Sequence, residues 1–394
     1  YFSYFSASRT GSLILKNQGR TMKKSMFIFS ALLLIGCDNS NPSSDSTPWT
    51  FDPGSSENTP WTFDPGSSEN TLWTFVANEG SFGSNNGTVS MVDEFGEVYE
   101  TEVIGDVVQS IEVYNNKLIV AINVSEKLAI FDISEAGLSN WVEVDLSGTP
   151  PREIAVVNGR AYVSCWGDSD YNVYGTVPGY LKVVNLETLE VETSIEVGIM
   201  PEGLVYDLSN LWVANSGGST LSKIDVTSNT VTETIEVGKG PQNLILNNND
   251  IYISRRWYEV YEVDDQGYWV DYEELHGSSM IGGSEIVMRD YGSGIVCGGS
   301  VVKFNDAVYR SYNGGIYSLD SELNLESAGR IGEYESSPYS VEVINNFLWF
   351  SIRGDVDENY IESNGTVRVL DSSGAEVSFY NVGIAPGDFA HWTK

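Results

Sequence analysis

The chain has 394 residues, of which 41% are hydrophobic and 12% aromatic, enough for a large packed core. It carries 55 acidic against 21 basic residues, a formal net charge of −34. So negative a surface repels phosphate backbones, which argues against nucleic acid as a partner.

The first element along the chain is a leader, MKKSMFIFSALLLIGC, which starts at Met22. Two lysines precede an apolar run that is too short to cross a bilayer, as in a secretory signal sequence. The LIGC segment resembles the bacterial lipobox, in which the cysteine, here Cys37, becomes the lipidated first residue of the exported protein. The alternative is an ordinary signal peptide with a chance cysteine. We interpret residues 1–21 as translated upstream sequence and residues 22–36 as the lipoprotein signal peptide.

A second segment, residues 37–70, is rich in Ser, Asn, Pro and Asp. The 12-residue phrase TPWTFDPGSSEN begins at Thr47 and again at Thr59, and TLWTF follows at Thr71. Pro and Gly recur with Ser-Ser-Glu-Asn between them, which is typical of a flexible tether.

From residue 71 onward the chain repeats a longer unit. A Gly/Pro turn followed by a short apolar strand recurs at Val108, Pro151, Pro201, Pro241, Pro338 and Pro386, and GGSVVKF near Ser300 supplies the copy missing from that spacing. Each is followed by an alternating apolar strand, seven in all, such as KLIVAIN and NLWVANS. A third strand ending in Asp or Asn and a fourth strand complete the unit. Alternation with period two and many β-branched and aromatic residues indicate strands, and no stretch shows helical periodicity.

Four strands in each 40 to 50 residues, repeated seven times, predict an all-β, seven-bladed β-propeller of four-stranded blades over residues 71–394. The first copy lacks a first strand, whereas the last anchor, Pro386, starts a first strand with nothing after it. We therefore expect the C-terminal strand to complete the first blade and close the ring.

The phrases V-G-x-x-P-x-x-L, LWVANSGGSTLSKID and VTETIEVG resemble the YVTN family of β-propellers, the YncE-like group. The resemblance covers residues 71–394 and implies a propeller scaffold. Some lipid-anchored members of this group in Bacteroidota capture ligands at the cell surface, including vitamin B12 beside an outer-membrane transporter. The resemblance supplies no ligand motif that transfers residue by residue.

Few residues suit catalysis or metal binding. His276 and His391 are the two histidines, neither in a recognisable triad, and no zinc-ligand spacing or phosphate-binding loop is present, so we expect no cofactor and no enzyme activity. Asp93, Asp132, Asp225, Asp320 and Asp371 end third strands and are interpreted as turn caps. Two acidic loops space oxygen ligands at alternate residues and are weak calcium candidates: Asp168, Asp170 and Asn172, and Asp355, Asp357 and Asn359. Cys165 and Cys297 fall in non-adjacent blades, which favours two separate thiols over a disulfide.

The connections between second and third strands are long in copies one, three, five and seven (78–87, 166–179, 255–283 and 353–365). In a propeller these loops share one face with the links between blades. Arginine and aromatic side chains gather there, and such side chains supply contacts at recognition surfaces; the alternative in copy five is an extra hairpin held by aromatic pairs. The candidate binding residues are Arg152, Trp166, Tyr171, Tyr174, Arg255, Arg256, Trp257, Tyr258, Trp269, Arg310, Arg353 and Tyr360.

The sequence thus predicts a non-enzymatic, lipid-anchored propeller of the cell envelope, tied to the outer membrane through Cys37. Its partner would be a small molecule or glycan, or an envelope protein such as an outer-membrane transporter, with corrinoid capture as the most concrete version. The alternatives are a scaffold or adhesin that binds protein or polysaccharide, and a propeller lyase or hydrolase.

Overall fold

The computed structural model describes residues 71–169, 175–264, 269–294, 296, 299–334, 338–357 and 361–393. The predictions of an upstream segment, a signal peptide, lipidation at Cys37 and a tether all lie outside these residues. The described residues form strands and connections, and none of them makes a helix of the length and apolarity needed to cross a membrane.

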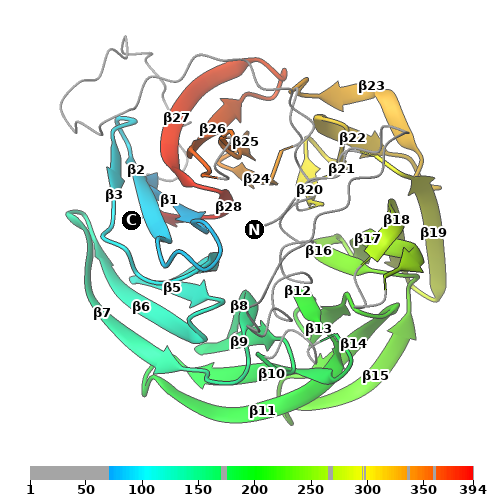
Figure 1. Ribbon diagram of the computed structural model, residues 1–394, viewed down its shortest axis with the longest axis horizontal. Helices are drawn as coiled ribbons and strands as arrows, with labels where there is room; N and C mark the ends of the chain where they lie inside the picture. Colours follow the sequence, from blue (N-terminus) through cyan, green and yellow to red (C-terminus); the bar gives the residue numbers. More distant parts are fainter. Residues whose placement is uncertain are drawn as a thin grey trace, which may run out of the picture.

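Seven four-stranded antiparallel sheets stand around a central axis, so the predicted seven-bladed β-propeller is confirmed (Figure 1). Each blade is given from its innermost to its outermost strand. Blades one to three are β28 (Pro386–Thr393), β1 (Thr71–Asn78), β2 (Thr88–Asp93), β3 (Val98–Glu100); β4 (Val108–Tyr114), β5 (Lys117–Ile122), β6 (Lys127–Ser134), β7 (Gly137–Asp145); and β8 (Pro151–Val157), β9 (Arg160–Cys165), β10 (Pro178–Asn185), β11 (Glu190–Ile199). Blades four and five are β12 (Pro201–Tyr206), β13 (Asn210–Asn215), β14 (Thr220–Asp225), β15 (Thr230–Glu236); and β16 (Pro241–Asn247), β17 (Asp250–Val263), β18 (Trp269–Gly282), β19 (Glu285–Gly292). Blades six and seven are β20 (Val301–Phe304), β21 (Ala307–Tyr312), β22 (Gly315–Leu319), β23 (Leu325–Ile331); and β24 (Ser340–Ile344), β25 (Phe347–Ile352), β26 (Asn364–Leu370), β27 (Glu376–Ile384).

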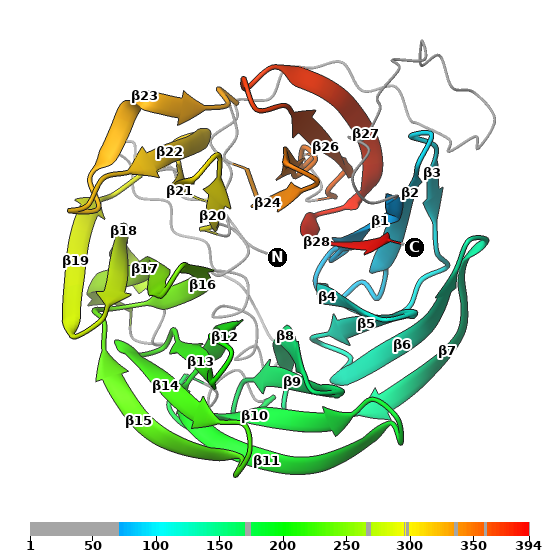
Figure 2. The same ribbon diagram turned by 180° about the vertical axis from the view of Figure 1, so that it is seen from behind.

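The ring closes as the repeat pattern predicts. The C-terminal strand β28 pairs antiparallel with β1, with Ala390 opposite Phe75 and Phe389 opposite Val76. Figure 2 shows the red strand β28 beside the blue strand β1, so that the two ends of the described chain share blade one. Closure matters because it removes the two unpaired blade faces that an open row of sheets would expose.

Apolar side chains pack between neighbouring blades and form the core. Fully buried residues on the second strands, such as Val120, Val163 and Val213, belong to such clusters, each shared by two adjacent sheets. The blades are thus held mainly by the face-to-face burial of apolar surface, which is why one unit would not be stable without its neighbours.

Recurring polar residues explain the rest of the repeated phrase. Asn215 ends β13 in the VAN phrase; its Nδ2 donates to Thr220 Oγ1 and Ser222 Oγ, both at 3.0 Å, and its Oδ1 accepts from the Gly198 amide. Asn78 in blade one donates in the same way to Thr88 and Ser90. These buried side chains satisfy polar groups where the second strand turns into the third.

The aspartates at the ends of third strands cap turns, as predicted, in four of five cases. The Oδ1 atoms of Asp93, Asp225, Asp320 and Asp371 accept backbone N–H groups two to four residues further on. Asp132 differs because β6 continues to Ser134, whose hydroxyl accepts from the Ala136 amide instead; Asp132 pairs with Lys117 at 3.2 Å.

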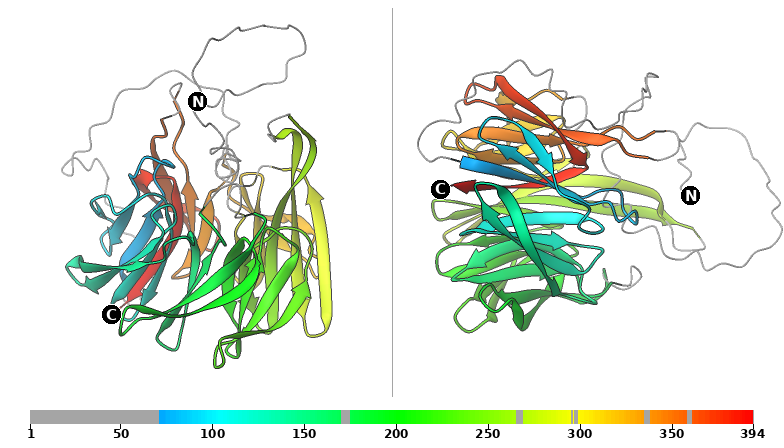
Figure 3. Two further views of the ribbon diagram at one scale, coloured as in Figure 1. Left: turned by 60° about the horizontal axis from the view of Figure 1, so that its bottom comes forward. Right: turned by 90° about the vertical axis from the view of Figure 1, so that its left-hand side faces the viewer.

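The sequence interpretation of blade five was wrong in one respect. The long segment after Arg255 is the extra hairpin given as the alternative above: β17 and β18 continue as two paired 14-residue strands. The segment SEIVMRD, interpreted as the third strand of copy five because it ends in Asp, instead enters the fourth strand, β19. In Figure 3 the yellow-green strands of this hairpin project beyond the ring.

Candidate functional site

Several innermost strands, among them β8, β12 and β16, begin with a bulge that re-aims the residues after the anchor. The pairing register shifts between Pro151 and Ile154, and likewise after Pro201 and Pro241. A bulge leaves one backbone N–H outside the ladder and re-aims side chains. Serines of the second strand accept this N–H: Ser164 from Glu153, at 3.0 Å, and Ser254 from Asn243, at 3.0 Å. Arg152 and Glu153, and likewise Gln242 and Asn243, therefore both line the centre of the ring.

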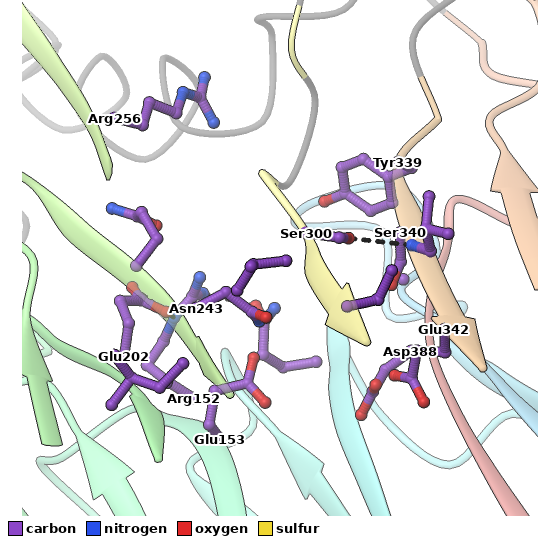
Figure 4. Close-up of a pocket in the computed structure, with 18 of the residues that line it drawn as sticks. Arg152, Glu153, Glu202, Asn243, Arg256, Ser300, Tyr339, Ser340, Glu342 and Asp388 are labelled. Carbon is purple, nitrogen blue, oxygen red and sulfur yellow. Dashed lines mark hydrogen bonds and ion pairs between the residues drawn. The ribbon is translucent and has the colours of Figure 1, made fainter. Parts of the chain in front are cut away.

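These side chains line an axial cavity of about 390 Å³. Every blade contributes to it through its innermost strand, and residues after β1, β9 and within β17 line it as well. Figure 4 shows the side chains converging from separate strands. The polar and aromatic lining residues are Glu79, Phe82, Gln109, Asn123, Arg152, Glu153, Trp166, Glu202, Gln242, Asn243, Arg256, Ser300, Lys303, Tyr339, Ser340, Glu342 and Asp388.

Arg152 is the centre of one network in this wall. Its Nε lies 3.0 Å from both carboxylate oxygens of Glu202, and its Nη1 donates to Gln109 Oε1. The guanidinium stacks on the indole of Trp166, 4.5 Å from the ring centroid, and Trp166 Nε1 donates to Glu202 at 3.1 Å. Burial raises the pKa of Glu202, and the charge of Arg152 limits the rise. The network fixes a cation and an aromatic face at the cavity wall.

A second network surrounds Glu79. Its Oε1 accepts the Tyr339 hydroxyl at 2.8 Å, and Arg353, which pairs with both oxygens of Glu362, lies 5.2 Å from the Tyr339 ring centroid. Burial raises the pKa of Glu79 to about 7, although Arg353 and the Tyr339 hydrogen bond oppose the shift. Glu79 is thus a proton-binding group at the cavity in the neutral pH range.

Four innermost strands each carry a further carboxyl group, namely Glu112, Glu153, Glu342 and Asp388. Glu342 and Asp388 lie beside each other on neighbouring blades (Figure 4). Burial first, and then the charge of Asp388, hold the pKa values of Glu153 and Glu342 well above their usual range, and burial likewise raises that of Asp388. Burial also raises the pKa of Glu112 to about 7. Carboxyl groups kept protonated can donate hydrogen bonds as well as accept them.

No group of three or more His, Cys, Asp or Glu side chains suited to a metal ion occurs within the described ranges. Of the calcium candidates, Asp170, Asn172 and Asn359 lie outside them, whereas Asp168 and Asp355 lie in described loops. Asp357 Oδ1 accepts the Ile361 amide at 2.9 Å, a local turn contact. Cys165 is a buried free thiol whose pKa burial raises to about 12, and Cys297 lies outside the described residues.

The structure distributes the predicted binding residues over three places. Arg152, Trp166 and Arg256 line the cavity, with Arg353 adjacent through Tyr339. Trp257, Tyr258 and Trp269 lie on the β17–β18 hairpin, where the Tyr258 and Trp269 rings are 5.4 Å apart. Arg255 and Arg310 are buried, 3% and 0% exposed. Tyr171, Tyr174 and Tyr360 lie outside the described residues.

The acidic half of the cavity was not predicted from the sequence. Glu153, Glu202, Tyr339 and Asp388 stand one or two places after the repeated anchors, a position that varies from copy to copy while the anchors recur. The contrast between recurring anchors and a varying next position could have pointed to the cavity residues. Glu342 lies four places after its anchor, Pro338, in a position that is apolar in most copies, so it could have been noticed in the same way.

Comparisons with known proteins extend the account of the fold. No protein-family model and no curated protein matches the sequence. Among solved structures, a candidate 6-phosphogluconolactonase from Bacteroides fragilis NCTC 9343 aligns with a TM-score of 0.55 at 12% identity, covering 84% of this chain and 100% of that one. A second such candidate, from Bacteroides uniformis ATCC 8492, gives 0.54 at 9%, covering 82% and 100%. A protein from Lactobacillus plantarum gives 0.52 at 12%, covering 82% and 99%. The likeness is one of fold alone.

Proposed function

We propose that the chain is a binding module whose axial cavity holds a small polar ligand rich in hydroxyl groups, such as a glycan unit. The observation that carries this proposal is the cavity itself, about 390 Å³, to which every blade contributes. This volume falls within the roughly 300–1,000 Å³ of small-molecule sites.

The lining favours hydroxyl groups over a fully charged ligand. Arg152 and Arg256 supply donors, Asn243 supplies both kinds of group, and Glu79, whose pKa burial raises to about 7, supplies both when it is protonated. Both arginines already pair with carboxylates, Arg152 with Glu202 and Arg256 with Glu274, so neither brings an uncompensated charge to the cavity. A hydroxyl group, which donates and accepts, fits such a mixed wall.

The cellular setting in this proposal is the bacterial envelope. Support comes from the leader before Cys37 and from the phrases that resemble YVTN propellers, including their lipid-anchored, ligand-capturing members. A corrinoid is larger than the axial cavity, so in a corrinoid-capturing version it would lie across the long-loop face and insert only a substituent. A glycan unit delivered to an outer-membrane transporter fits the cavity without that restriction.

Binding of glycans and other small polyols, measured by calorimetry after a thermal-shift screen, tests the proposal. Asp388→Asn and Glu153→Gln keep the shape of two cavity side chains but change their hydrogen bonding. Each should weaken binding about fivefold or more, since one hydrogen bond is worth about 1 kcal/mol or more. Glu94→Gln, at an exposed turn outside the cavity, is the control and should bind like the wild type. Unchanged affinity in both cavity variants would exclude the axial site.

One observation favours a second candidate function, a hydrolase or lyase. Glu342 and Asp388 form a partly buried carboxyl pair with raised pKa values, an arrangement that general acid–base catalysis also uses. The calorimetric experiments with glycans and polyols also distinguish the binding module from the enzyme. A binding module returns its ligand chemically unchanged after prolonged incubation, whereas an enzyme converts it at a rate that falls in Asp388→Asn.

The scaffold or adhesin alternative rests on the exposed hairpin. Tyr261, Val263 and Val270 are 62%, 53% and 58% exposed near its tip. Glu259 faces Glu273 across the hairpin, so an Asn-Gly turn placed between them would replace residues 260–272 without touching the blade. Under our proposal this shortened protein keeps its glycan affinity, whereas under the alternative it loses binding to protein or polysaccharide partners.

A further inference from the structure

The interface between blades five and six differs from the other six. Each of those contains an apolar cluster of buried residues drawn from two adjacent sheets. Within the described parts of the chain no such cluster joins β16–β19 to β20–β23. Arg256, His276 and Arg310 are buried there instead, between 0% and 7% exposed.

Arg310 occupies a position that is apolar in every other blade. In the register of the innermost and second strands it pairs with Val301. The residues in the same place are Val76, Val120, Val163, Val213, Ile253 and Phe350, each opposite an apolar residue of its own innermost strand. A guanidinium has thus replaced a core side chain at one point of the ring.

The charges at this interface do not balance. Arg256 Nε lies 2.7 Å from Glu274 Oε1. Arg310 has no ion pair with any carboxylate of the described residues. Its Nη1 donates to Ser311 O at 2.7 Å and Ser311 Oγ at 3.0 Å, and its Nη2 reaches only Arg255 O, at 3.5 Å.

Burial lowers the pKa of Arg310 to about 10, and Arg256 and Arg255 add to the effect. The guanidinium therefore stays charged at neutral pH. Isolated buried charges are strongly unfavourable unless an opposite charge accompanies them.

Unsatisfied polar atoms also concentrate here. Eight buried side-chain nitrogen or oxygen atoms of the described residues lack a hydrogen-bond partner, and four of them belong to His276, Ser278 and Arg310. They include Nε of Arg310 and Nδ1 of His276, while His276 Nε2 is directed to Glu274 at 3.3 Å. Native proteins seldom leave such groups unpaired without a bound water or ion.

Gly299 gives the Arg310 guanidinium its space. A Cβ on Gly299 would lie 3.3 Å from Arg310 Nη2.

We propose that a small inorganic anion, chloride or an oxyanion such as phosphate, binds between blades five and six, with Arg310 as its principal partner. The anion neutralises the Arg310 guanidinium, which has no carboxylate partner among the described residues, and accepts from its unpartnered Nε. A bound water molecule would satisfy these hydrogen bonds but would leave the positive charge of Arg310 without a counter-charge. The site goes beyond the proposed function, because Arg310 does not line the axial cavity.

The test is the thermal unfolding of the full chain at pH 7 in sodium gluconate, with gluconate replaced stepwise by chloride, bromide or phosphate at constant ionic strength. The midpoint should rise and saturate in at least one of these anions. At an anion concentration a hundred times its Kd, the unfolding equilibrium constant should fall about a hundredfold. Arg310→Met, which restores an apolar side chain, should abolish the response. Arg368→Met, which removes a half-exposed ion pair with Glu376, should keep it.

A crystal grown in bromide gives an independent readout that does not depend on a variant's folding. Its anomalous peak should lie within hydrogen-bond distance of Arg310. Identical midpoints in all four salts, an unchanged response in Arg310→Met, or the absence of bromide from this interface would each overturn the proposal. The Asp388→Asn variant should keep the anion response, which separates this site from the axial cavity.

Discussion

Replacing Glu79 by glutamine should alter how stability depends on pH. Glu79 follows β1, is 2% exposed, and accepts the Tyr339 hydroxyl at 2.8 Å. Its burial raises the pKa from the ordinary value of 4.5 to about 7. Between these values the unfolded chain has lost this proton while the folded chain retains it, so the free energy of unfolding must fall as pH rises.

The size of the effect follows from the shift. Each pKa unit corresponds to about 1.4 kcal/mol, so Glu79 should remove roughly 3 kcal/mol of stability between pH 4.5 and pH 7 or slightly above. Glutamine has the shape of the neutral carboxyl group and does not titrate. Glu112, whose pKa burial also raises to about 7, contributes in the same direction to both proteins, so their difference isolates Glu79.

Urea unfolding at pH 5, 6, 7 and 8 measures this difference. Relative to the wild type, Glu79→Gln should gain roughly 3 kcal/mol from pH 5 to pH 8, with similar denaturant slopes. The exposed Glu94→Gln variant, which removes a carboxylate far from the cavity, should run parallel to the wild type. If Glu79→Gln also runs parallel, Glu79 is not a neutral, buried acid and our reading of the cavity is wrong.

Three further predictions concern the scaffold. Gly240→Ala should lower the free energy of unfolding by about 2–4 kcal/mol in urea, because Gly240 has φ +64° and an added Cβ would lie 1.9 Å from Arg256 O. Gly83→Ala, with φ +74° and nothing within 4 Å, should lose only about 1 kcal/mol. Removing residues 386–394 should abolish the cooperative unfolding transition and produce aggregates in size-exclusion chromatography, since β1 would lose its partner; a monomer with the wild-type midpoint would contradict ring closure. Cys165, fully buried with its pKa raised to about 12, should resist iodoacetamide in the native protein and react in urea, as peptide mass spectrometry would show; equal labelling in both would contradict its burial.

The sequence predicted the fold well because the fold depends on features that recur. The anchors at Pro151, Pro201 and Pro241 mark the innermost strands, and alternation marks the strands that follow. Even the missing first strand of copy one identified β28 as the closing strand. Such periodic signals arise because every blade packs against its two neighbours in the same way.

The site was harder to predict because it depends on departures from the repeat. Glu153 and Asp388 share a position that is not acidic in the other copies, Glu342 shares its position only with Glu112, and nothing in the local sequence shows that these residues meet near the axis. Arg310 was expected at a rim, since an arginine in a strand is usually exposed, whereas it lies in a core position between blades. Only the register of the folded ring brings these residues together.

The most direct test of the central claim is a crystal structure of the protein with the tightest-binding glycan from the screen. Our account predicts ligand density inside the axial cavity, with hydroxyl groups within hydrogen-bond distance of Arg152, Glu153 and Asp388. A glycan bound only to the β17–β18 hairpin, with nothing but water among the cavity side chains, would contradict it.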